Sequence, residues 1–356
     1  MISGNVQRFA AARTLVLPVL LSIGLVARAP FPALAGTSGT WANTGSMNID
    51  RFAHTATLLQ NGQVLVAGGG GSAGIQASAE LYNPATGKWT FTGSMTTARY
   101  FHTAVLLPSG EVLVPGGSNN EGLTAEAELY NPSTGQWTKT GSMETPRSQA
   151  GSTLLQDGQV LVAGGYLIAS AELYNPATGM WTFTGSMHYA RESQAALLQN
   201  GQVLMAGGNT AELYSNGSWT LTSNLKFGAG PGAVPLTNGD VVVFGGNSNP
   251  SEFYNPSTNT WTVAVFSGNT HYGPLTLLNT GEVLLAGGES SYGADAICDL
   301  YNSSINEWLR TGTMNHPRSE HTATLLQNGQ VLAGGGQVKN LKGGFITLAS
   351  AELYTP

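Results

Sequence analysis

A pattern of about 40 residues recurs seven times along the chain, so the chain must be built from one small unit used repeatedly. Each unit contains a Gly-Gly pair, then a Glu-Leu-Tyr element or a close variant, then a tryptophan. The Gly-Gly pairs lie at 68–69, 116–117, 164–165, 207–208, 245–246, 287–288 and 335–336. The tyrosines are Tyr82, Tyr130, Tyr174, Tyr214, Tyr254, Tyr301 and Tyr354, and the tryptophans are Trp41, Trp89, Trp137, Trp181, Trp219, Trp261 and Trp308.

The unit at 54–93 predicts four short strands separated by turns, at 54–59, 63–69, 78–83 and 88–93. Asn-Gly between the first two strands predicts a tight hairpin, because both residues tolerate positive φ. Asn-Pro-Ala-Thr-Gly between the last two predicts a turn that starts at proline. In the fourth unit this turn shortens to Ser-Asn-Gly-Ser at 215–218. A loss of two residues keeps every side chain on its face of the sheet, which indicates genuinely paired strands.

Four-stranded units of about 40 residues predict a β-propeller. The seventh unit stops after Tyr354 without a fourth strand, whereas residues 40–47 form an unattached fourth strand at the other end of the pattern. Pairing the two would complete the last blade and remove exposed strand edges. The sequence therefore predicts an all-β protein in which residues 36–356 form a single seven-bladed propeller with antiparallel four-stranded blades.

The Gly-Gly pairs, the tyrosine and tryptophan of each unit, and an arginine after a methionine resemble the kelch superfamily over residues 41–356. The resemblance implies partner binding on one face of the propeller, with arginines at the start of the first strands among the contacts. It also implies a distant similarity to the propeller of galactose oxidase, which binds copper with a Tyr-His pair on such a strand.

Residues 1–35 resemble a secretory signal peptide. Arg8 and Arg13 precede an apolar run at 15–27, and Ala-Leu-Ala at 33–35 offers small residues for cleavage, with cleavage after Ala29 as the alternative. The run is short for a membrane span and contains a proline. We therefore expect a secreted protein, extracellular or periplasmic, without membrane insertion.

The charge and cysteine content narrow the classes of partner. Without residues 1–35 the chain has 20 acidic residues and 11 lysines and arginines, a formal charge of −9. Such a chain lacks the basic surface that nucleic acids and anionic lipids require. Its single cysteine, Cys298, cannot form an internal disulfide, so the protein must rely on its core. We expect a monomer without a cofactor.

The two faces of the expected propeller differ in sequence. Turns between first and second strands, and between third and fourth strands, leave from one face, the turn face, and are monotonous. Loops between second and third strands, and connections between blades, leave from the other face, the loop face. The loops there vary strongly, as at 70–77, 118–125, 289–297 and 337–348. Variable loops on a rigid scaffold usually carry the binding function.

An arginine on the loop face follows a methionine by four residues in five units, whereas the fifth and sixth units have Ala229 and Thr270. Either these arginines ring the channel mouth and contact a ligand, or they tie blades together and satisfy loop carbonyls. The arginines are Arg51, Arg99, Arg147, Arg191 and Arg318. Tyr100, next to Arg99, would offer an aromatic surface for a bound sugar or peptide.

Three histidines, His54, His102 and His321, follow the arginines of the first, second and seventh blades, which the closed ring makes neighbours. Together they could bind a metal, but strand alternation favours packing between blades. The residue before each histidine is Ala53, Phe101 or Glu320 rather than tyrosine. The pair that the galactose oxidase resemblance would require is therefore missing, which disfavours a copper-radical oxidase.

Two functions remain open. The favoured one is a non-catalytic binding propeller that recognises a protein or a glycan through its loop face. The alternative is a carbohydrate-active enzyme, oxidase-like or lyase-like, at the channel mouth, where the divergent blades place His271, Tyr272 and the loop around Asp295. The acids Glu121, Glu192, Glu289 and Glu320 are candidates for a carboxylate pair or are solvated loop residues, and Cys298 is expected to be packed.

Overall fold

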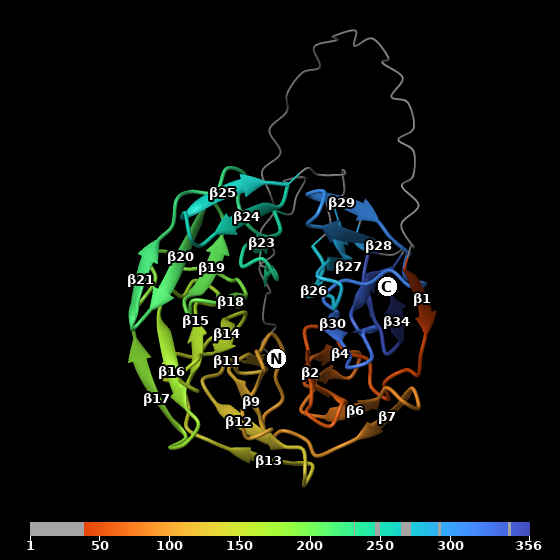
Figure 1. Ribbon diagram of the computed structural model, residues 1–356. Coiled ribbons are helices and arrows are strands. Elements are labelled where there is room, and N and C mark those ends of the chain that lie inside the picture. Colours follow the sequence, from red (N-terminus) through yellow and green to blue (C-terminus); the bar gives the residue numbers. More distant parts are fainter. Residues whose placement is uncertain (1–38, 231, 246–249, 265–271, 291–292, 341–342) are drawn as a thin grey trace, which may run out of the picture. The chain divides into compact units, whose positions relative to one another are not determined.

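The computed structural model describes residues 39–230, 232–245, 250–264, 272–290, 293–340 and 343–356. The expected signal peptide at 1–35 lies outside these residues. Within the unit Thr37–Pro356, the described elements are all β-strands, and they form seven four-stranded antiparallel sheets with three small two-stranded hairpins. The predicted all-β, seven-bladed propeller is confirmed (Figure 1).

Blades 1 to 6 follow the chain from an inner first strand to an outer fourth strand, whereas blade 7 takes its outer strand from β1 (Thr40–Asn43) (Figure 1). Blade 1 is β2 (Thr55–Leu58), β3 (Val64–Ala67), β6 (Ala79–Asn83) and β7 (Lys88–Phe91); blade 2 is β8 (Val105–Leu106), β9 (Val112–Pro115), β12 (Ala127–Asn131) and β13 (Gln136–Lys139); blade 3 is β14 (Gly151–Leu154), β15 (Val160–Ala163), β16 (Ala171–Asn175) and β17 (Met180–Thr184). Blade 4 is β18 (Ala195–Leu197), β19 (Val203–Gly207), β20 (Thr210–Ser215) and β21 (Ser218–Leu221); blade 5 is β22 (Ala233–Pro235), β23 (Val241–Val243), β24 (Glu252–Asn255) and β25 (Thr260–Val263); blade 6 is β26 (Leu275–Leu277), β27 (Val283–Ser290), β28 (Gly293–Asn302) and β29 (Glu307–Arg310). Blade 7 is β30 (Thr322–Leu325), β31 (Val331–Gly334), β34 (Ala351–Thr355) and β1 (Thr40–Asn43).

The N-terminal strand completes blade 7, as the sequence predicted. β1 pairs antiparallel with β34, and Trp41 lies opposite Tyr354. Figure 1 shows the red β1 beside the blue β34. The same tyrosine–tryptophan register recurs inside the other blades, for example between Tyr82 and Trp89. The ring is therefore closed by two segments from opposite ends of the chain.

The turns explain why the strands keep their register. In blade 4, Tyr214 still lies opposite Trp219 despite the shortened turn, so the parity argument is confirmed. That turn places both Asn216 (φ 47°) and Gly217 (φ 82°) in the left-handed region. In the Asn-Gly turn of blade 1 only Gly62 has positive φ, at 81°. Asn61 contributes through its side chain instead, because its Oδ1 accepts from the Gln63 N–H.

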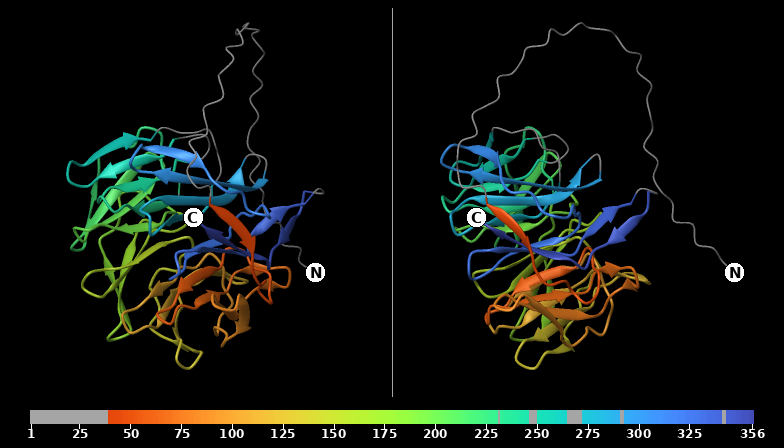
Figure 2. Two further views of the ribbon diagram at one scale, coloured as in Figure 1. Left: turned by 45° about the vertical axis from the view of Figure 1, so that its right-hand side comes forward. Right: turned by 90° about the vertical axis from the view of Figure 1, so that its right-hand side faces the viewer.

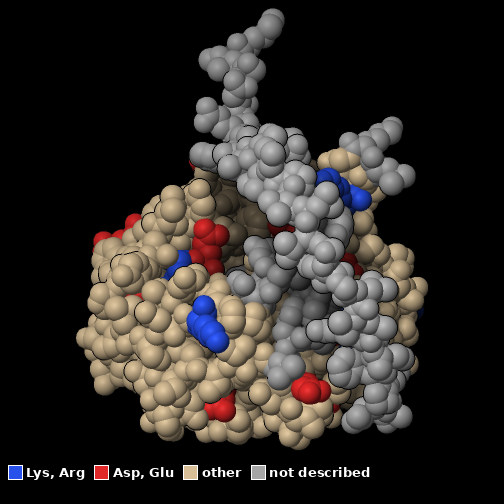
Figure 3. Space-filling view, turned by 90° about the horizontal axis from the view of Figure 1, so that it is seen from above, with Lys and Arg blue, Asp and Glu red and all other residues tan. Residues whose placement is uncertain are grey.

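Short hairpins extend from the blades on the loop face. They are β4–β5 (Gly70–Gly71 and Gly74–Ile75), β10–β11 (Ser118–Asn119 and Gly122–Leu123) and β32–β33 (Gln337–Lys339 and Phe345–Thr347). The blue β32–β33 hairpin projects from the ring in the side views (Figure 2). Charged side chains are scattered in the view from above (Figure 3), which agrees with a charged content of 10%.

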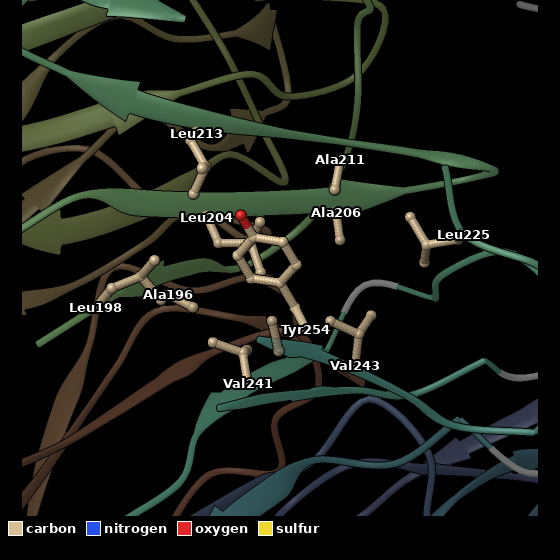
Figure 4. Packing of buried hydrophobic residues seen from close by; sticks show 11 residues of the cluster. Ala196, Leu198, Leu204, Ala206, Ala211, Leu213, Leu225, Val241, Val243 and Tyr254 are labelled. Carbon is tan, nitrogen blue, oxygen red and sulfur yellow. The ribbon is translucent and has the colours of Figure 1, made fainter. Parts of the chain in front are cut away.

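The core consists of seams between neighbouring blades rather than one central cluster. Seven clusters of buried apolar side chains each join two adjacent blades. In the seam between blades 4 and 5, the Tyr254 ring packs with Leu204 and Leu213 (Figure 4). The repeated tyrosines and tryptophans therefore hold blades together, since they supply much of the apolar area buried in these seams. No helix among the described residues is long and apolar enough to cross a membrane.

Candidate functional site

The five repeated arginines are buried side chains at the start of the blades. Their exposed fraction is between 0 and 6%. In blade 1, Nη1 of Arg51 donates to the carbonyls of Gly68 (2.8 Å) and Ser78 (2.9 Å), and Nη2 donates to Glu80 Oε1 (3.1 Å). Each guanidinium thus links the end of the second strand to the start of the third strand in its own blade.

The acidic partner is the glutamate of the Glu-Leu-Tyr element. Glu80 accepts from the backbone N–H groups of Asn48 (2.7 Å) and Ile49 (3.1 Å), which belong to the connection that enters the blade. Equivalent ion pairs join Arg99 to Glu128, Arg147 to Glu172, Arg191 to Glu212 and Arg318 to Glu352. Burial lowers the pKa of Arg51, while the hydrogen bond and charge of Glu80 oppose this shift. The pair fixes the inter-blade connection onto the sheet.

The backbone of each arginine joins two blades. The N–H of Gly69, which follows the second strand of blade 1, donates to the carbonyl of Arg99 in blade 2 (2.8 Å). Gly68 and Gly69 both have positive φ, at 64° and 98°. A Cβ on Gly68 would lie 2.6 Å from the Arg99 carbonyl oxygen, so the Gly-Gly pair is required by this close approach. The same bond recurs in blade 4, where Gly208 donates to Ala229.

Of the two roles that the sequence left open for the arginines, these contacts favour the scaffold. The terminal nitrogens of each guanidinium are bonded to a carboxylate and to carbonyls, and the Nε groups of Arg51, Arg147 and Arg318, which have no partner among the described residues, are themselves buried. These guanidinium groups therefore present no free donor to a ligand at the surface. Blade 5, with Ala229, retains a buried Glu252 that binds the N–H groups of Lys226 and Phe227. Thr270 lies outside the described residues. The sequence contained the signal, because every unit with the arginine also has a glutamate before Leu-Tyr.

The three histidines are buried between neighbouring inner strands. His54 Nε2 lies 3.1 Å from Thr322 Oγ1, and His102 Nε2 lies 3.0 Å from Thr55 Oγ1. Each therefore contacts the first strand of the preceding blade. Burial, with the charge of the nearby arginine, lowers the pKa of both histidines to about 3. Neither ring nitrogen of His321 has a hydrogen-bond partner among the described residues, and its pKa is also lowered by burial.

The remaining candidates lie apart from one another. The backbone of Tyr100 forms an isolated antiparallel β-bridge with Ser118, and Tyr272 forms the equivalent β-bridge with Glu289 in blade 6. His271 lies outside the described residues. Cys298 is fully buried, and burial raises the pKa of its thiol to about 12.

Among the acids, Glu289 and Glu320 come close enough to interact. Glu320 is exposed as a residue, but partial desolvation of its carboxyl group raises the pKa of Glu320, and the charge of Glu289 adds to the shift. Glu121 and Glu192 are exposed, and Asp295 is half-buried on β28. Across the part of the chain that the structure describes, no group of three His, Cys, Asp or Glu side chains could hold a metal ion.

Comparison with known proteins agrees with this geometry. The family profile described as Kelch motif matches residues 51–96, which span the arginine, the Gly-Gly pair, the tyrosine and the tryptophan of blade 1. The chain is a kelch-repeat β-propeller. A fungal alcohol oxidase of the AA5 family, solved in complex with copper, has a similar fold, with a TM-score of 0.72 and 17% identity over 90% of this chain and 77% of that chain. No curated protein sequence matches.

Aromatic residues of this kelch-repeat propeller gather on the loop face. Five tyrosines lie outside the repeat pattern. Tyr100, Tyr166, Tyr189 and Tyr272 are in the loops and connections of this face, and Tyr292 lies outside the described residues. The turn face has two cavities of about 470 and about 400 Å³, between blades 7 and 1 and between blades 2 and 3. Both are lined by the same repeated turns, so they belong to the repeat rather than to one specialised site.

Proposed function

We propose that the protein is a secreted binding propeller that recognises a protein or a glycan through its loop face, without catalysing a reaction. The observation that carries the proposal is the distribution of exposed apolar side chains. Twelve large apolar side chains are strongly exposed among the described residues, and seven of them lie on the loop face. These seven are Leu123, Tyr166, Leu167, Tyr189, Phe227, Phe345 and Ile346.

The other five exposed apolar side chains have a different distribution. Four lie on the outermost strands, and only Ile305 lies on the turn face. Exposed aromatic and aliphatic side chains that gather on one face mark interaction sites. Leu167 is 78% exposed and has a positive φ of 58°. An apolar side chain held in this unfavourable backbone conformation is better explained by contact with a partner than by folding.

The test compares the two faces in one binding assay. The mature protein is screened against immobilised glycans and against the secreted proteins of its producer. The double variant Tyr166→Ser/Leu167→Ser should lose at least tenfold in affinity for a protein ligand, because it removes two exposed apolar contacts. Ile305→Ser is the matched control on the turn face and should leave affinity unchanged. Equal binding by both variants would contradict the proposal.

A carbohydrate-active enzyme at the same face is the second candidate. It is favoured by one observation, the raised pKa of Glu320 beside Glu289, since perturbed carboxyl groups are typical of acid–base sites. The test is release of new sugar ends from polysaccharides by the mature protein, compared with Glu320→Gln. Activity that the variant loses would establish the enzyme and overturn the non-catalytic proposal.

A further inference from the structure

Four residues of blades 7, 1, 2 and 3 form a continuous row on the loop face, here called the inner row. Its members are Glu320, Ala53, Phe101 and Gln149. The Gln149 N–H donates to the Phe101 carbonyl (2.9 Å), Phe101 donates to Ala53 (2.9 Å), and Ala53 donates to Glu320 (3.0 Å). Each residue follows its arginine by two positions. The inner row thus places one side chain from each of four consecutive blades side by side.

The backbone of the inner row is in an unfavourable conformation. Its four φ angles lie between 50° and 56°, in the left-handed region that residues other than glycine rarely adopt. The repeat does not impose this conformation everywhere, because Ser193, at the equivalent place in blade 4, is not among the residues with positive φ. The inner row therefore extends over blades 7, 1, 2 and 3 and does not continue into blade 4.

Phe101 of the inner row and two neighbouring aromatic residues, Tyr100 and Phe52, form a group of three rings, here called the aromatic trio. The rings of Tyr100 and Phe101 have centroids 4.9 Å apart. Tyr100 also meets Phe52 edge-on, with centroids 6.3 Å apart. All three side chains are partly exposed. A partly exposed group of rings that is held in place by its neighbours is the kind of surface on which sugar rings stack.

The polar groups beside the trio select among ligands. Glu320 and Gln149, both exposed, stand at the two ends of the inner row, and the small Ala53 separates Glu320 from Phe101. Carboxylate and amide oxygens accept hydrogen bonds from hydroxyl groups, and the amide also donates. The arginines of these blades are buried in their own ion pairs, so the charged group of the inner row is a carboxylate. Anionic sugars would be repelled there.

We propose that the inner row and the aromatic trio form a subsite for a neutral oligosaccharide, with a sugar ring stacked on Phe101 and Tyr100 and its hydroxyls bonded to Glu320 and Gln149. The inference rests on the proposed binding function of the loop face and names its ligand class.

The test uses isothermal titration of the mature protein with neutral hexasaccharides of glucose, mannose and xylose, and with hexagalacturonate as the anionic counterpart. At least one neutral hexasaccharide should bind, and hexagalacturonate should bind at least tenfold more weakly. Phe101→Ala should weaken the neutral sugar about tenfold. This variant should fold, because Ala53 shows that alanine is accommodated at the equivalent left-handed position.

Two further variants sharpen the test. Ala53→Leu places a larger side chain between Glu320 and Phe101 in the inner row and should also weaken binding, although it removes no contact. Phe91→Ala is the matched control, since Phe91 is 58% exposed on the outer strand β7, and it should bind like the wild type. Thermal melting of every variant shows whether it is folded.

The outcomes separate this inference from the proposed function. If no neutral hexasaccharide binds, or if binding is the same in Phe101→Ala, the subsite is overturned. If hexalysine binds instead and Glu320→Gln abolishes its binding, the site recognises a basic peptide and the sugar inference is wrong. In either case, the proposed binding function of the loop face would still hold if a protein ligand binds the wild type and its affinity falls in Tyr166→Ser/Leu167→Ser.

Discussion

Replacing Arg147 by alanine should destabilise the propeller without changing its affinity for a ligand. The guanidinium donates to the carbonyls of Gly164 (3.0 Å) and Ser170 (2.7 Å), and to Glu172 Oε1 (2.9 Å). Its removal leaves these carbonyls and a buried carboxylate without their donor. Removing one partner of a buried ion pair costs about 3–5 kcal/mol.

The expected cost lies at the lower end of this range. Glu172 keeps its bonds from the N–H groups of Glu144 (2.8 Å) and Thr145 (3.1 Å), so the carboxylate is not left wholly unpaired. We expect the free energy of unfolding to fall by about 3 kcal/mol. The measurement is urea unfolding. Lys139→Ala, which breaks an exposed pair with Glu126, is the matched control and should cost under about 1 kcal/mol.

A double-mutant cycle identifies the cause. If Glu172 is the partner that matters, Arg147→Ala/Glu172→Gln should be less destabilised than the sum of the single variants, by about 0.5–3 kcal/mol. Ligand binding is measured on the folded fraction of the same samples. An unchanged free energy of unfolding together with a tenfold loss of affinity would refute the argument. It would favour the ligand-binding role of the arginines that the sequence left open.

Three further outcomes are expected. The folded-state pKa of His54 and of His102 is about 3, below the ordinary value of 6.5, so the unfolded chain takes up protons first as the pH falls. Urea unfolding should therefore show about 2 kcal/mol less stability per histidine at pH 5 than at pH 7. A pH-independent free energy of unfolding would contradict burial of the neutral rings. Deleting residues 36–47, which include β1, should leave β34 as an unpaired edge strand and lower the melting temperature or cause aggregation. An unchanged melting temperature in a monomeric variant would show that the ring is closed by a different contact. Elemental analysis of protein purified without chelator or affinity tag should find no stoichiometric transition metal, whereas about one copper or zinc per chain, lost in His102→Ala, would promote the enzyme candidate.

The sequence alone determined the blades, because a blade is stabilised by contacts that are local along the chain. Alternation with a period of two, Asn-Gly turns and the recurring tyrosine–tryptophan register specify hairpins within about 40 residues. The closure by β1 and β34 is long-range, but it was also predictable, since a missing strand at one end and a surplus strand at the other leave a single way to pair both edges.

Only the tertiary structure decided what the side chains of the loop face do. Arg51 and Glu80 are 29 residues apart. The recurrence of both residues in five units signals a pair, but it does not indicate that the guanidinium is buried. Burial depends on how the connection, two strands and the next blade close around it. The exposure of Phe101 and Glu320 on the loop face also depends on the tertiary structure. Their position follows from a left-handed backbone and from bonds between neighbouring blades, which exist only once the ring has formed.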